Sequence, residues 1–386
     1  MLQKSKIFFG ILLGIASTSS AFFNDFDQQP HNYWEREPTD PVSKYLAARA
    51  GEGSVLRQRE FVEELLAEFD IPAASQALVF SKTSLQRKEV GPENPRAMYF
   101  NEDVYLGWMP GGRIEIASAD PKLGLIFYYE DIRPPEAETP ATFARDKVCL
   151  ECHAGAATNF LPGPLARSVY PDDRGRARGS VKSFDLMSHT VPIAERWGGW
   201  FVSGGHGFSH LGNQTGERTP AARPFPSTLD VTKYPVPTSD ALALMVFDHQ
   251  IGIHKQIIES HYKVRQAEHD GDYDTIAPKE AAKLVAQLTF QGEVPFDSAS
   301  IQPSPEFIKA FRRNRRTTTE GHSLKDFAYD QGRLFQHRCS YMIYSSSFQG
   351  MPDEFRKLVY ASLATALEND PATLAIIRHT LSDFIE

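Results

Sequence analysis

The 386-residue sequence contains only three cysteines, Cys149, Cys152 and Cys339. This small number excludes a domain held together by several disulfides. Long apolar runs are also scarce. After residues 7–16, no segment approaches the roughly 20 apolar residues that span a bilayer. The phosphate-binding loop of nucleotide enzymes and the G-x-S-x-G turn of serine hydrolases are absent. No catalytic residue can therefore be assigned from a familiar motif.

Positive charge is in deficit. The chain has 41 Lys and Arg against 49 Asp and Glu, which gives a formal net charge of −8. A mildly acidic surface argues against nucleic acid and anionic membranes as main partners, because both attract positively charged proteins. The same surface suits docking with basic redox partner proteins.

The first 21 residues have the pattern of a secretory signal peptide. Lys4 and Lys6 form a short positive region, residues 7–16 form an apolar core, and Ser19-Ser20-Ala21 offers small residues for cleavage. We expect a mature periplasmic chain that begins near Phe22, with no integral membrane segment. Cleavage removes two lysines and no acid, so the formal charge moves from −8 to −10. An uncleaved membrane anchor is the alternative.

The segment Cys149-Leu150-Glu151-Cys152-His153 is the attachment signature of c-type haem. In such motifs each thiol adds to one haem vinyl group, and the adjacent histidine supplies a nitrogen to the iron. A four-thiolate zinc site would need a second cysteine pair, and a thioredoxin-like pair would not require the histidine. We predict one covalent haem c, held by Cys149 and Cys152, with His153 as the proximal iron ligand. A carbonyl in the proline loop 161–164 is expected to orient His153.

A second iron ligand is expected within residues 184–213. This stretch gathers groups that ligate iron, wall a haem pocket or neutralise its propionates: Met187, His189, Arg196, Trp197, Trp200, His206 and His210. We predict His189 as the distal ligand, because the stiff Thr190-Val191-Pro192 segment follows it. His206, His210 and Met187 are the alternatives.

Other candidate ligands have simpler interpretations. Cys339 lies in a mostly apolar stretch and is expected to be buried and inert, although an intermolecular bridge or iron ligation is also open. His249, His254 and His261 fall on a predicted long helix. They could face the haem or a second metal, but we interpret them mainly as packing or surface residues.

The hydrophobic periodicity predicts an α+β fold, with a small antiparallel sheet, a c-type haem-binding segment and a mainly helical C-terminal half. Three to five strands are expected within residues 77–130, and a short helix at 141–148 is expected to lead into the motif. The predicted organisation is a signal peptide (1–21), an N-terminal helical segment (22–76), a haem-binding α+β domain (77–215), a proline-rich connector (216–238) and a helical C-terminal domain (239–386).

Three sequence blocks carry a resemblance to a known group. Residues 94–101 (NPRAMYFN), 196–200 (RWGGW) and 339–345 (CSYMIYS) resemble secreted bacterial cytochrome c domain proteins. Residues 149–179 are similar, more loosely, to PAS-like c-type haem sensor domains, which carry a comparable turn: Tyr170, Asp172, Asp173, Gly175 and Gly179. The resemblance implies a haem c protein and transfers no catalytic residue.

These observations favour a periplasmic monohaem c-type cytochrome that carries out single-electron transfer between redox partner proteins. One alternative is a haem-dependent oxidoreductase with an open distal site, in which His206 or His210 handles protons. The other is a haem-based redox or ligand sensor.

Overall fold

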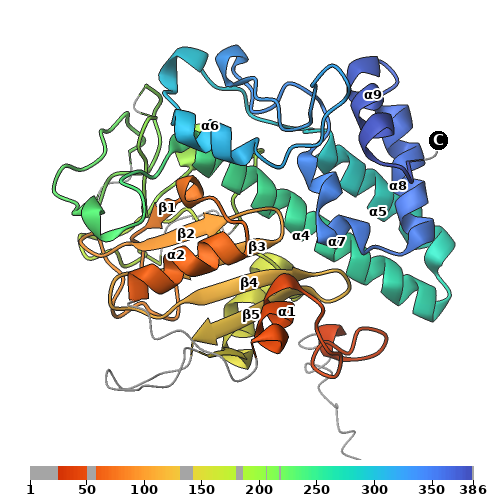
Figure 1. Ribbon diagram of the computed structural model, residues 1–386, viewed down its shortest axis with the longest axis horizontal. Helices are drawn as coiled ribbons and strands as arrows, with labels where there is room; N and C mark the ends of the chain where they lie inside the picture. Colours follow the sequence, from red (N-terminus) through yellow and green to blue (C-terminus); the bar gives the residue numbers. More distant parts are fainter. Residues whose placement is uncertain are drawn as a thin grey trace, which may run out of the picture.

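The computed structural model describes residues 25–49, 58–130, 142–179, 186–205, 207–216 and 219–384. The predicted signal peptide and His206 lie outside these residues. Within them, the chain has the predicted α+β character, with an antiparallel sheet in the first half and a helical C-terminal half (Figure 1).

The sheet has seven strands in the order β6-β5-β4-β3-β2-β1-β7, and every neighbouring pair is antiparallel. The strands are β1 (Ala77–Val79), β2 (Arg96–Phe100), β3 (Val104–Trp108), β4 (Glu115–Asp120), β5 (Gly124–Glu130), β6 (Phe143–Arg145) and β7 (Trp200–Phe201). From β1 to β6 the order follows the chain, as short turns between antiparallel strands allow. The sheet is larger than the sequence predicted.

Register decides which residues share a face of this sheet. Tyr105 pairs with both Phe100 and Ala117, and Ala117 pairs with Phe127. Paired residues point to the same side, and residues two apart do so as well. Met98 on β2 and Glu115 on β4 therefore lie on this same face.

Helices cover both faces of the sheet (Figure 1). On one face, α1 (Pro41–Ala48) packs against β4, and its capping residue Asp40 accepts a hydrogen bond from Tyr128 at 2.7 Å. Helix α2 (Gln58–Glu68) lies in front of the sheet beside α1 in the view of Figure 1. On the face that carries Tyr105, α4 (Ala241–Asp270) packs Phe247 against Phe100, with ring centroids 5.1 Å apart. The sheet is thus the middle layer of three.

The C-terminal helices assemble along α4. They are α5 (Tyr273–Leu288), α6 (Pro305–Phe311), α7 (Ser346–Gln349), α8 (Asp353–Ala366) and α9 (Pro371–Thr380). Helix α5 packs against both α4 and α8. Asp240 caps the N-terminus of α4, because its side chain accepts a hydrogen bond from the backbone N–H of Ala243. None of the helices in the described ranges is long and apolar enough to cross a membrane.

The helix predicted at residues 141–148 was wrong for the part described. Phe143–Arg145 forms the edge strand β6, and only Lys147–Cys149 makes a short 3₁₀ turn. Pairing of β6 with the free edge of β5 outweighs the local helical pattern, because tertiary context routinely overrides propensity.

Buried apolar residues of the sheet and of the helical half form one continuous core. The predicted domains 77–215 and 239–386 therefore share packing across the sheet face that α4 covers. Cys339 is fully buried within this core, as expected, and burial raises the pKa of its thiol.

Gly198 is a tight point between two segments of this fold. A Cβ atom there would lie 2.1 Å from the carbonyl oxygen of Val169, whose N–H donates to the Gly198 carbonyl at 2.9 Å. We expect Gly198→Ala to lower the free energy of unfolding by about 2–3 kcal/mol, since the backbones must separate. Urea denaturation would measure this effect. Gly179→Ala is the matched control, because nothing lies within 4 Å of its added Cβ. Equal stability of the two variants would contradict the prediction.

Candidate functional site

The two motif cysteines lie on consecutive turns of the chain. Cys149 ends the 3₁₀ turn and is half-buried, and Cys152 lies on α3 (Leu150–His153) and is exposed. Asp146 begins the segment by accepting a hydrogen bond from the N–H of Val148 at 2.9 Å. Neither cysteine is in a disulfide. Burial raises the pKa of the Cys149 thiol to about 12.

His153 is held by a reciprocal pair of hydrogen bonds with Gly163. Its Nδ1 lies 3.0 Å from the Gly163 carbonyl oxygen, and the Gly163 N–H donates to the His153 carbonyl at 2.9 Å. A carbonyl can only accept, so Nδ1 carries the proton and Nε2 keeps the lone pair that a metal needs. This is the contact predicted for the proline loop. Burial lowers the pKa of His153 to about 4, so its ring is neutral at pH 7.

Both cysteines and His153 line one open cavity of about 1040 Å³, a volume that includes the space at its mouth. Its walls come from the sheet face under α4, the 164–167 segment, β7 and α4 itself. The apolar wall residues include Val79, Met98, Ile116, Ala117, Leu125, Phe127, Leu165, Ala166, Trp200, Phe247 and Ile251. This aromatic and aliphatic lining beside the motif suits the apolar faces of a haem.

The site provides further features that fit this group. Phe127 packs on the His153 ring, with centroids 4.4 Å apart. Arg96 and Arg167 line the cavity and could face carboxylates such as haem propionates, and Arg96 forms an ion pair with Glu115. On the same sheet face, the Met98 side chain packs over Gly107, since an added Cβ there would lie 3.0 Å from the Met98 sulfur.

The predicted distal candidates lie away from this cavity. Among the described residues, none of Met187, His189 and His210 contributes to its lining. Instead, the Nδ1 of His189 lies 3.0 Å from the Nδ1 of His249, in a buried cluster with Phe290. The structure therefore does not bring His189 to the motif, and His206 is outside the described residues.

Arg196 and Trp197 serve a buried polar network. The Trp197 indole donates to Asp248 at 3.0 Å, and the Arg196 guanidinium lies 3.6 Å from the same carboxylate. Arg196 also donates to the backbone carbonyls of Val191 and His189. Of the predicted pocket residues that the structure describes, only Trp200 lines the cavity. The cationic side chains in its described lining are Arg96 and Arg167, which come from outside residues 184–213.

Met98, Arg96 and Glu115 were missed by sequence reasoning as cavity residues. The first two belong to the block at residues 94–101, which carried a resemblance and no assigned role. Their alternation along β2 places both on one face, but only the pairing of β2 with its neighbours shows that this face meets the motif.

Two of the α4 histidines, His249 and His254, are packing residues that form buried hydrogen bonds. His254 has both nitrogens satisfied, Nδ1 by Tyr105 at 2.9 Å and Nε2 by Ser347 at 2.8 Å. The Nε2 of His249 lies 2.8 Å from the Ser340 hydroxyl. Burial lowers the pKa of His254 to about 3.

His254 should make stability depend on pH. Between pH 6.5 and about 3, the unfolded chain binds a proton at His254 that the folded chain refuses, so stability falls as the pH falls. We expect His254→Gln to cost about 1–3 kcal/mol at pH 7.5. The gap to wild type should narrow by up to about 1.4 kcal/mol per pH unit below pH 6.5. Denaturant titrations at several pH values would measure it. A gap that stays constant with pH would contradict this assignment.

The chain was compared with protein-family models, curated proteins and solved structures, and none of them matched.

Proposed function

We propose that the chain is a c-type cytochrome that binds one haem through Cys149 and Cys152 and carries single electrons between redox partner proteins. One observation carries the proposal. The CxxCH segment lines a mostly apolar cavity, and the Gly163 carbonyl fixes its histidine with Nε2 available. When bound there, a haem would supply one-electron oxidation and reduction of its iron.

His153 is the proposed proximal ligand. Its neutral ring and fixed tautomer mean that no proton has to leave Nε2 when a metal binds. Thr158 steadies the same turn, since its hydroxyl donates to the carbonyls of His153 and Gly155, both at 3.1 Å. These contacts hold the motif in one conformation, which favours rapid electron exchange with little rearrangement.

Met98 replaces His189 in our proposal for the opposite side of the iron. Apart from the motif residues, it is the one histidine, cysteine or methionine in the described lining of the cavity. The other candidate donors there, Tyr105 and Tyr128, already hydrogen-bond to His254 and Asp40. A methionine ligand raises the potential of a haem, as suits an electron carrier.

The surface around the motif supports electron transfer rather than chemistry in a closed site. Cys152 is exposed, so the edge that its sulfur holds would be accessible to a partner. The formal charge of −8 favours basic partner proteins. The predicted signal peptide and the export that haem attachment needs both support a periplasmic location.

The attachment proposal is tested by removing the thiols. We expect Cys149→Ala combined with Cys152→Ala to release all haem on denaturing extraction, whereas the wild-type mass should include one haem. Cys339→Ala is the control, because that thiol is buried away from the cavity. Release of haem from the denatured wild type would overturn the proposal.

The ligand proposal is tested by Met98→Leu, which keeps nearly the same volume. We expect the absorption spectrum to change from low-spin to high-spin, and the reduction potential to fall by on the order of 100 mV, within the roughly 0.8 V range that axial ligands control. Met187→Leu is the control, since Met187 is buried outside the cavity.

Two results would redirect this proposal. An unchanged spectrum in Met98→Leu would remove Met98 as the ligand. A high-spin spectrum in the wild type itself would favour the alternative of a haem oxidoreductase with an open distal site.

A further inference from the structure

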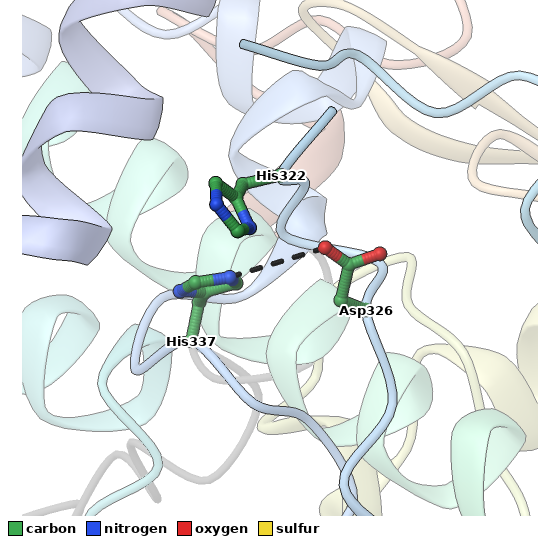
Figure 2. A group of neighbouring side chains, drawn as sticks. All are labelled: His322, Asp326 and His337. Atoms are coloured by element: carbon green, nitrogen blue, oxygen red, sulfur yellow. Dashed lines mark ion pairs between the residues drawn. The ribbon is translucent and has the colours of Figure 1, made fainter. Parts of the chain in front are cut away.

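A second group of possible metal ligands lies far along the chain from the motif, in the segment between α6 and α7. It consists of His322, Asp326 and His337, and one donor atom from each lies within 4.8 Å of the others. Figure 2 shows the two imidazole rings and the carboxylate facing a common space. His337 and Asp326 are buried, whereas His322 is exposed.

Local backbone structure brings the three residues together. Phe327 and Phe335 form an antiparallel bridge, and next to it the Gln336 N–H donates to the Asp326 carbonyl at 2.8 Å. This register sets Asp326 beside His337. His322 lies at the end of a tight turn. The N–H of Thr318 donates to the His322 carbonyl at 3.0 Å, and Gly321 within this turn adopts a φ of 90°.

His337 has a buried donor atom without a partner. Its side chain is about 5% exposed, yet its Nε2 has no hydrogen-bond partner. The closest oxygen of Asp326 lies 3.9 Å away, which is too far for a hydrogen bond. Buried polar atoms are nearly always paired, so an unpaired one aimed at two other ligand-type groups points to a missing ion.

Asp326 is held in place by its neighbours, as ligating carboxylates commonly are. One carboxylate oxygen accepts from the Arg312 guanidinium at 2.7 Å, and the other accepts from the Ser323 N–H at 2.8 Å. The second oxygen is the one that faces His337. The adjacent positive charge of Arg312 opposes cation binding. Glu320 and Asp330 add negative charge, because they line an open cleft of about 390 Å³ together with His322 and Asp326.

We propose that His322, Asp326 and His337 bind one divalent first-row transition ion, for which Zn²⁺ is the probe. Two imidazoles and one carboxylate suit zinc and its neighbours, whereas Ca²⁺ and Mg²⁺ prefer oxygen ligands alone. Bonds of about 2.0–2.2 Å need tetrahedral ligand atoms about 3.3–3.6 Å apart, so the group closes by about 1 Å on binding. The exposed His322 side chain supplies that movement. The open cleft leaves a coordination position for water or a small ligand.

Isothermal titration of tag-free, haem-loaded and EDTA-treated protein with ZnCl₂ tests this site. We expect one Zn²⁺ per chain, confirmed by elemental analysis after gel filtration. His322→Ala should weaken binding at least 10-fold, and it should fold normally because the side chain is exposed. His379→Ala, which removes an exposed histidine from α9, is the matched control and should bind like wild type. A tenfold excess of CaCl₂ should not compete.

A second variant separates binding from an effect on folding. Zn²⁺ should raise the melting temperature of the wild type, and Asp326→Asn should lose most of that rise. Absence of one-to-one binding by the wild type would overturn the proposal. So would wild-type affinity in His322→Ala, or an equal loss in His379→Ala. These measurements report Zn²⁺ binding and do not depend on the haem content. Failure of the zinc proposal can therefore be distinguished from failure of the cytochrome proposal.

Discussion

The fold depends on burying α4 almost all round. Most of this 30-residue helix is buried, including polar residues such as Asp248, His249 and His254. A helix buried on every side needs packing partners in every direction, and its polar groups need hydrogen bonds. The sheet supplies Tyr105, the 196–200 segment supplies Trp197, and the 339–347 segment supplies Ser340 and Ser347. Segments far apart in the sequence are joined through this one helix.

This constraint gives two of the three sequence blocks a structural explanation. The RWGGW block supplies the hydrogen-bond and ion-pair partners of Asp248, which are Trp197 and Arg196. The CSYMIYS block supplies Ser340 and Tyr341, and the Tyr341 hydroxyl donates to Gln250 at 2.8 Å. These packing contacts explain the residues of both blocks without a catalytic or ligand-binding role. The block at residues 94–101 differs, because it places Arg96 and Met98 in the cavity beside the motif.

The sequence predicted well what depends on neighbours along the chain. The CxxCH motif and the carbonyl that orients His153 lie within 15 residues, and short-range geometry sets both. The cavity walls were not predictable, because strand pairing decides that the face carrying Met98 meets the motif. The surroundings of His189 were equally unpredictable. A histidine near tryptophans and an arginine has the same sequence signature in a haem pocket as in a buried hydrogen-bond network, and α4 decides which forms.

The partner of His153 bears on which haem chemistry the proposed site favours. A carboxylate on Nδ1 would make the imidazole more basic, whereas the Gly163 carbonyl is neutral and polarises the ring less. A less basic proximal ligand stabilises ferrous iron, and a methionine opposite it acts in the same direction. The only acidic side chain in the described lining, Glu115, is already paired with Arg96 and so adds little negative charge. The proximal hydrogen bond, the candidate sulfur ligand and the charge balance of the cavity therefore all favour a raised potential, which is a property of an electron carrier.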